Sequence, residues 1–134
     1  MKVVDGTDAI LGRLSSFVAK QLLEGEDMTI VNCEKVIITG NKKRIQEDFK
    51  EKRSKVGSGQ KGPKVSRLSE QIVRRAVRGM LPNHREGRGK IAFKKLKCYV
   101  GIPTEYEKSQ KILAGRKPKV PYKSKILKVE EIFQ

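Results

Sequence analysis

The chain has 134 residues, a length that favours a single domain able to bury about two thirds of its unfolded surface without disulfides or metals. It carries 31 Lys and Arg against 15 Asp and Glu, so its net charge is +16, which destabilises a compact state unless a polyanion is bound. No apolar stretch approaches the roughly 20 residues of a membrane span, and the N-terminus lacks a signal-peptide core.

Strands and helices alternate along the first half of the chain. We expect strands at 2–4, 28–33 and 36–39, and helices at 10–23 and 42–55. Asp8 can cap the first helix, and Gly25 suits its C-terminal end. The continuous apolar character of residues 28–33 favours a strand that is buried on both faces.

The next helix is expected over residues 72–81. Its apolar residues recur with the spacing of one helical face: Ile72, Val73, Ala76, Val77, Met80 and Leu81. Arg74, Arg75 and Arg78 fall on the other side. Ser69 can cap the start of this helix, and Gly79 and Pro82 bring it to an end.

A Gly-broken basic loop over residues 83–90 follows, and a buried strand is expected at 98–102. Beyond it, residues 105–113 suit a helix, 115–123 an extended segment, and 126–133 a strand or a terminal turn. The alternation of elements predicts an α/β domain over 1–103 with a largely parallel sheet. Residues 104–134 are expected to form a C-terminal basic extension, packed on the domain or on neighbouring molecules.

Positive charge is concentrated in the middle of the chain. Residues 1–41 have a net charge of −2, residues 42–97 of +14 and residues 98–134 of +4. The basic side chains form two groups: Lys50, Lys52, Arg53, Lys55, Lys61, Lys64 and Arg67, then Arg74, Arg75, Arg78, Arg85, Arg88, Lys90, Lys94, Lys95 and Lys97. A merely solvated face would need compensating acids, and residues 52–69 contain none.

This charge pattern favours structured RNA as the partner. Arg suits bidentate phosphate contacts, and glycines in basic loops let the backbone approach phosphates closely. Only Phe93 and Tyr99 offer rings nearby, and neither zinc fingers nor heptads are present, so RNA read through phosphates, 2′-hydroxyls and shape fits best. A DNA-compacting protein, which would bind duplex DNA equally well, remains an alternative.

Catalytic, nucleotide and metal sites find less support. The turn at Gly40-Asn41 before Lys42 could hold a phosphate at a helix N-terminus, but the Walker and dinucleotide signatures are absent. An enzyme acting on RNA remains open and predicts a pocket near Gly40, although His84 has no partner in a recognisable motif. Cys33 and Cys98 form no C-x-x-C pair, which favours buried reduced thiols in a cytosolic protein. We expect no metal, cofactor or small-molecule substrate.

Several stretches resemble the universal large-subunit ribosomal protein L-thirteen family in its archaeal and eukaryotic form. They are LGRL (11–14), VNCEK (31–35), ITGN (38–41), KGP (61–63), VRGMLP (77–82), RG (88–89), FKKLK (93–97) and YVGIP (99–103). The resemblance covers residues 3–103, and its most specific part is VRGMLP followed by FKKLKCYVGIP.

The resemblance implies a three-layer α/β/α fold around a small parallel four-stranded sheet. It also implies a structural, non-catalytic protein of the large ribosomal subunit in the cytoplasm, which binds large-subunit rRNA, joins early in assembly and contacts neighbouring ribosomal proteins. The rRNA-facing residues that it implies are Arg13, Lys61, Arg74, Arg75, Arg78, Arg88, Lys94 and Lys97. The resemblance and the charge pattern together give the set of candidate RNA-binding residues: Arg13, Lys61, Lys64, Arg67, Arg74, Arg75, Arg78, Arg85, Arg88, Lys90, Lys94, Lys95 and Lys97.

Overall fold

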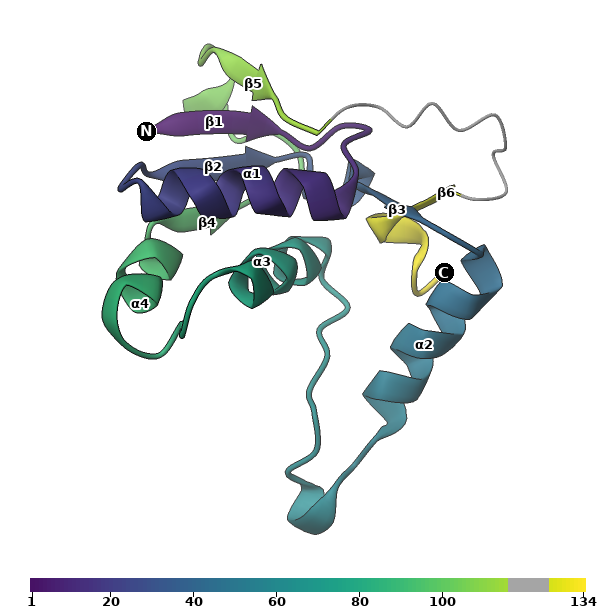
Figure 1. Cartoon of the computed structure of the whole chain (residues 1–134). Helices are drawn as coiled ribbons and strands as arrows, with labels where there is room; N and C mark the ends of the chain where they lie inside the picture. The colour runs from purple at the N-terminus through teal and green to yellow at the C-terminus, as the bar shows by residue number, and fades with distance from the viewer. Residues whose placement is uncertain (116–125) are drawn as a thin grey trace.

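The structure, a computed structural model, describes residues 1–115 and 126–134 (Figure 1). Its main sheet is parallel, with the strand order β4 (Leu96–Cys98), β2 (Met28–Val31), β1 (Lys2–Asp5) and β5 (Lys111–Leu113). β3 (Ile37–Thr39) and β6 (Ile126–Lys128) pair antiparallel in a second, two-stranded sheet. The helices are α1 (Leu11–Leu23), α2 (Lys42–Ser54), α3 (Ser69–Met80) and α4 (Gly87–Lys94).

The hydrophobic core lies between the main sheet and the helices α1, α3 and α4. Fully buried side chains from strands and helices form it together: Val4, Ile30, Leu14, Val18, Val73 and Val77. Because side chains alternate along a strand, Val3 and Val31 point to the opposite face, where buried Tyr106 covers them. The predicted three-layer α/β architecture around a small parallel four-stranded sheet is confirmed.

The first helix and strand show how the local sequence specifies these elements. Leu14, Val18 and Leu22 recur on one face of α1 and are buried, and Gly25 ends the helix with a left-handed φ of +97°. The predicted Asp8 cap is wrong, because Ile10 occupies the N-cap position and no side chain bonds there. All four residues of β2 are buried, which confirms the expectation of a strand covered on both faces.

Two strand predictions differ from the structure in their ends. β2 stops at Val31, because Asn32 adopts a left-handed conformation with φ 56° and a short 3-10 turn follows. The strand expected at 98–102 is instead β4, which ends at Cys98. Tyr99 still donates to the Ile30 carbonyl at 2.9 Å, but the loss of extended backbone at Asn32 ends the regular pairing.

Three local predictions are wrong, because tertiary packing outweighs the local sequence signal. The predicted loop over 83–90 contains the start of α4, and Gly89 is needed there since a Cβ would overlap the carbonyl oxygens of Pro82 and Asn83. The predicted helix over 105–113 is a 3-10 turn at Thr104–Tyr106 followed by β5. Ser69 begins α3 but makes no capping bond.

The C-terminal residues pack against the body. β6 pairs with β3, a 3-10 turn at Val129–Glu131 follows, and Ile132 is fully buried in the core. The strand or terminal turn predicted over 126–133 is therefore confirmed. The extended segment predicted over 115–123 lies outside the described residues apart from its first position.

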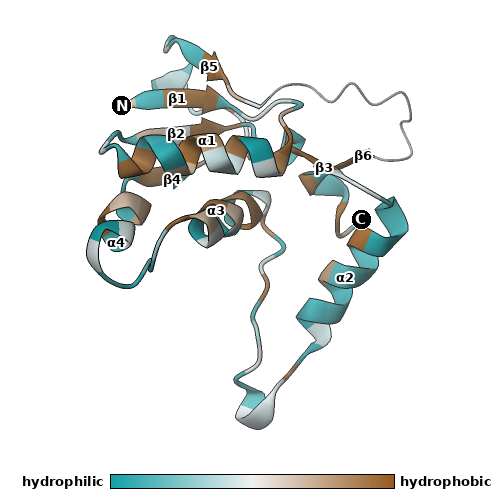
Figure 2. Ribbon diagram, in the orientation of Figure 1, coloured by the Kyte–Doolittle hydropathy of each residue, from teal (hydrophilic) through white to brown (hydrophobic). Residues whose placement is uncertain are grey.

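Residues 42–68, here called the arm, extend away from the body (Figure 1). The arm consists of α2 and the segment that returns to α3. No residue of α2 is buried, and Figure 2 shows the helix as mainly hydrophilic. Arg53 donates from Nη1 to the Val65 carbonyl at 2.8 Å, and Phe49 packs edge-on against Phe133 at 5.9 Å between ring centroids. These contacts hold the two sides of the arm together and attach the arm to the C-terminal segment.

Candidate nucleic-acid interface

A cavity of about 580 Å³, here called the α3 cavity, lies between the arm and α3. Its walls combine apolar side chains, including Phe49 from α2 and Phe93 from α4, with cations. The cations are Lys52, Lys64, Arg74, Arg75 and Arg78, and no acidic residue is among the described residues that line it. Leu11 of α1 also lines the cavity, so residues from five separate parts of the chain form one strongly positive, partly aromatic hollow.

The three arginines of α3 occupy different positions around the helix. Val73 and Val77 are fully buried, as the apolar periodicity predicts, and Arg75 is exposed. Arg74 and Arg78 are half-buried at the edge of the helix–core contact. The assignment of all three arginines to an outward face therefore needs correction, since only Arg75 is fully available to solvent.

Arg74 is held in place by an aromatic ring. Its guanidinium carbon lies 4.8 Å from the centroid of Phe93, a distance typical of a cation–π contact. Nε of Arg74 is buried and has no hydrogen-bond acceptor within the described residues. The side chain is thus fixed in orientation by packing, while part of its hydrogen-bonding capacity is unused.

The arm carries exposed cations that no acid neutralises. Lys61, Lys64 and Arg67 are all exposed, and Arg67 lies over the Phe133 ring at 5.9 Å. Over residues 1–115 and 126–134 there are three ion pairs, and Lys55 and Lys95 are the only cations between 42 and 97 that take part. The arm and the adjoining side of α3 therefore form a largely uncompensated positive surface.

The remaining candidates lie around this surface or apart from it. Arg13 is exposed in the first turn of α1. Exposed cations also lie in and before α4: Arg85, Arg88, Lys90 and Lys94. Lys97 is exposed on β4, where it pairs with Thr29 on the sheet face opposite to α1 and α3, so the structure does not bring it to the α3 cavity.

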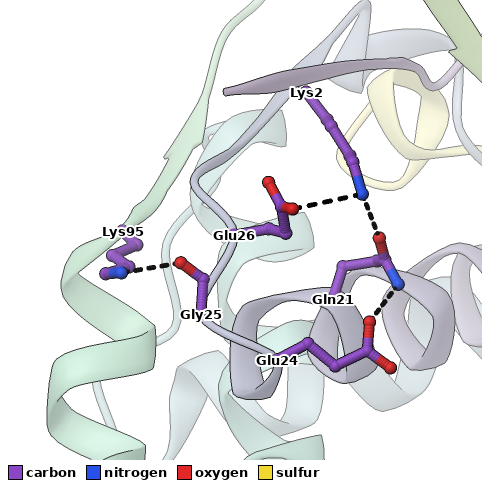
Figure 3. A network of polar contacts seen from close by, with 6 residues as sticks. All are labelled: Lys2, Gln21, Glu24, Gly25, Glu26 and Lys95. Carbon is purple, nitrogen blue, oxygen red and sulfur yellow. Dashed lines mark hydrogen bonds and ion pairs between the residues drawn. The ribbon is translucent and has the colours of Figure 1, made fainter.

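Lys95 has protein partners of its own. Its Nζ donates to the Gly25 carbonyl at 2.7 Å (Figure 3). The same Nζ lies 3.9 Å from Asp27. Figure 3 also shows Lys2, which pairs with Glu26 at 3.5 Å and donates to Gln21 at 2.8 Å. This polar network ties the turn after α1 to the sheet, so Lys95 has a structural role at this position.

Two residues that give the α3 cavity its character, Lys52 and Phe49, are absent from the candidate set derived from the sequence. Lys52 belongs to the basic group of the middle region but not to the final set of candidates, and Phe49 is an apolar residue of the helix expected at 42–55. Both line the cavity. The available signal is the helical spacing of Ile45, Phe49 and Lys52, which places them on one side of α2.

The alternative sites have ordinary structural explanations. Asn41 caps α2 by accepting a bond from the Lys43 amide at 3.1 Å, which accounts for the turn after Gly40. Among the residues that the structure describes, no group of three His, Cys, Asp or Glu side chains could hold a metal ion. None of the described helices has the length and hydropathy to cross a membrane.

The fold and this surface define a small basic α/β protein with a large uncompensated cationic face. A sequence model of the family described as Ribosomal protein L13 matches residues 1–105. Proteins named large ribosomal subunit protein uL13 are similar: that of Thermoplasma acidophilum is 47% identical, over 82% of this chain and 79% of its own. That of Methanosarcina barkeri is 40% identical, over 100% of this chain and 96% of its own.

The chain belongs to the ribosomal protein L13 family and is similar to archaeal members of it. The resemblance inferred from sequence motifs is thereby confirmed. Membership of this family also confirms the prediction of a structural protein rather than an enzyme.

Proposed function

We propose that this protein is a constituent of the large ribosomal subunit and binds large-subunit rRNA through the arm and the adjoining side of α3. The observation that carries this proposal is the uncompensated charge: 19 Lys and Arg against 5 Asp and Glu between residues 42 and 97. Family membership supports the large subunit as the assembly concerned. We further propose a cytoplasmic location on the ribosome, early joining in assembly, and contacts with neighbouring ribosomal proteins.

RNA binding should be strongly salt-dependent. A protein that neutralises about 6–10 phosphates is expected to lose roughly 10³–10⁵ in affinity between about 50 and 200 mM salt. The experiment is a salt series of binding to large-subunit rRNA with duplex DNA as competitor. Preference for rRNA at the high-salt end supports recognition of RNA shape, whereas equal competition at every salt concentration would refute the proposal in favour of DNA compaction.

Variants in which cations are replaced by neutral residues identify the surface that contacts RNA. Replacing Lys61, Lys64 and Arg67 together by Gln should lower the slope of log affinity against log salt by about 1 for each phosphate that the variant no longer neutralises. Lys20→Gln, an exposed substitution on α1 away from the arm, is the matched control and should leave the slope unchanged. An unchanged slope in the triple variant would exclude the arm as the contact surface.

A further inference from the structure

The α3 cavity has the size and lining of a ligand site rather than of a flat electrostatic contact. Its volume of about 580 Å³ is within the range of about 300–1,000 Å³ that is usual for small-ligand pockets. Contact with an RNA backbone requires only exposed cations. The cavity adds two rings, Phe49 and Phe93, which face it from different helices, and these suit a planar, partly apolar group.

The contact between Arg74 and Phe93 prepares a stacking surface in this cavity. Phe93 covers one side of the guanidinium at 4.8 Å and restricts its orientation. Unpaired RNA bases stack on guanidinium planes as well as on aromatic rings. Nε of Arg74 lacks an acceptor in the described part of the chain, so a small shift of the side chain toward a ligand oxygen would satisfy a buried donor.

The charges around the cavity indicate an anionic occupant. Lys52, Lys64 and Arg75 are exposed, whereas the rings and Arg74 are half-buried, so cations surround a more apolar interior. An apolar side chain from a neighbouring protein would use the interior but leave these cations without partners. A nucleotide matches both parts, because its base is planar and its flanking phosphates are negatively charged.

We propose that the α3 cavity binds one unpaired nucleotide of RNA. The base stacks on Arg74 beside Phe49, and the flanking phosphates lie on Lys52, Lys64 and Arg75. This inference rests on the proposed RNA-binding function and adds to it a specific preference for an unpaired position. The arm and α3 then recognise a bulge or loop, and a continuous duplex lacks the group that fills the cavity.

The test uses two short RNA duplexes that are identical except for one bulged 2-aminopurine nucleotide. The full-length protein should bind the bulged duplex about tenfold more tightly than the paired one, since stacking of one base typically contributes a factor of this order. The 2-aminopurine fluorescence should fall on binding because the base stacks. Arg74→Lys keeps the charge but removes the planar group, so it should abolish the preference.

Arg13→Lys is the matched control, because it makes the same change at an exposed position of α1 outside the residues that line the cavity, and it should keep the preference. Phe49→Leu is a second variant on a different element, which keeps apolar volume but loses the ring, and it should weaken the preference. The inference is overturned if the wild-type protein binds both duplexes equally or if Arg74→Lys behaves like Arg13→Lys.

Competition between large-subunit rRNA and duplex DNA, measured in the same buffer, separates the two proposals. If rRNA outcompetes DNA while the bulge gives no preference, the cavity inference alone fails. If rRNA does not outcompete DNA, the proposed function fails and the cavity inference fails with it.

Discussion

Asn32 donates a hydrogen bond from Nδ2 to Oδ1 of Asp5 over 2.9 Å and joins the carboxyl ends of β2 and β1. The same oxygen accepts bonds from the amide of Thr7 at 2.9 Å and from its hydroxyl at 2.7 Å. Asn32 is only 5% exposed, so its amide depends on this carboxylate for a partner. The bond therefore fixes the left-handed turn with which β2 ends.

Replacing Asp5 by Ala should destabilise the fold through this network. The substitution leaves the buried Asn32 amide without its acceptor, which should cost about 1–3 kcal/mol in the free energy of unfolding. Urea unfolding at pH 7 measures this loss. Asp48→Ala, at an exposed position of α2, is the control and should change the free energy by less than about 0.5 kcal/mol. Equal losses in the two variants would show that the network contributes nothing.

The stability that Asp5 contributes should disappear in acid. Burial by itself raises the pKa of Asp5, but the hydrogen bonds from Asn32 and Thr7 outweigh it and lower the pKa below its usual value. The pKa of Asp5 is therefore lower in the folded protein than in the unfolded chain, where it is about 3.9. The carboxylate stabilises the fold above about pH 3.9, and this stabilisation is lost as the pH falls through the pKa of the folded state. The difference in unfolding free energy between wild type and Asp5→Asn should therefore shrink between about pH 5 and pH 2.

The sequence is informative where a pattern is local. The helix faces of α1 and α3 follow from the spacing of residues such as Leu14, Val18, Val73 and Val77, which are buried as expected. β5 could not be predicted in the same way, because its three residues become a strand only through pairing with β1, more than a hundred positions earlier. Similarly, α4 contains two glycines, and its formation depends on packing against the segment before it.

The candidate site shows the same division. The sequence predicted which region carries the cations, because the positions of Lys and Arg can be read from it directly. It did not reveal the α3 cavity, because Phe49 and Phe93 come to line the same cavity only through the tertiary arrangement of α2, α3 and α4. Nor could it reveal that Lys95 is bound to Gly25.

Substitutions at Val77 and at Arg75, both on α3, should affect protein stability and rRNA binding separately. Val77→Ala removes fully buried volume from the core and should cost about 1–3 kcal/mol in unfolding free energy, with rRNA affinity unchanged while the protein remains folded. Arg75→Ala should weaken rRNA binding and leave the unfolding free energy unchanged, because the Arg75 side chain is exposed. Thermal unfolding and rRNA titration of both variants check this. A loss of stability in Arg75→Ala would contradict the assignment of its face.

Arg53 should control the order of the arm. Its Nη1 bond to the Val65 carbonyl links α2 to the returning segment. Arg53→Met keeps much of the side-chain volume but loses the bond, so amide hydrogen exchange over residues 56–66 should accelerate while exchange in β1 and β2 stays constant. Lys50→Met, at an exposed position of the same helix, is the control. Equal exchange rates in the two variants would show that the bond does not order the arm.

Cys33 should be chemically inert and should make the fold sensitive to alkali. Its side chain is fully buried, and the neighbouring Cys98 thiol together with burial raises the pKa of Cys33 well above its usual range. Iodoacetamide at about pH 8.5 should therefore modify half-buried Cys98 first and Cys33 only after unfolding. Modification of Cys33 in the folded protein at the rate of Cys98 would contradict this.

The direction of the pH effect follows from the raised pKa of Cys33. Below about pH 8.5 the thiol is protonated in both the folded and the unfolded chain, so its contribution to stability is fully present. Above that pH the unfolded chain releases the proton and the folded protein retains it. The free energy of unfolding should then fall by up to about 1.4 kcal/mol per pH unit. Cys33→Ala removes the titrating group, so its stability should decline less steeply between about pH 8.5 and 10 in the same urea titrations.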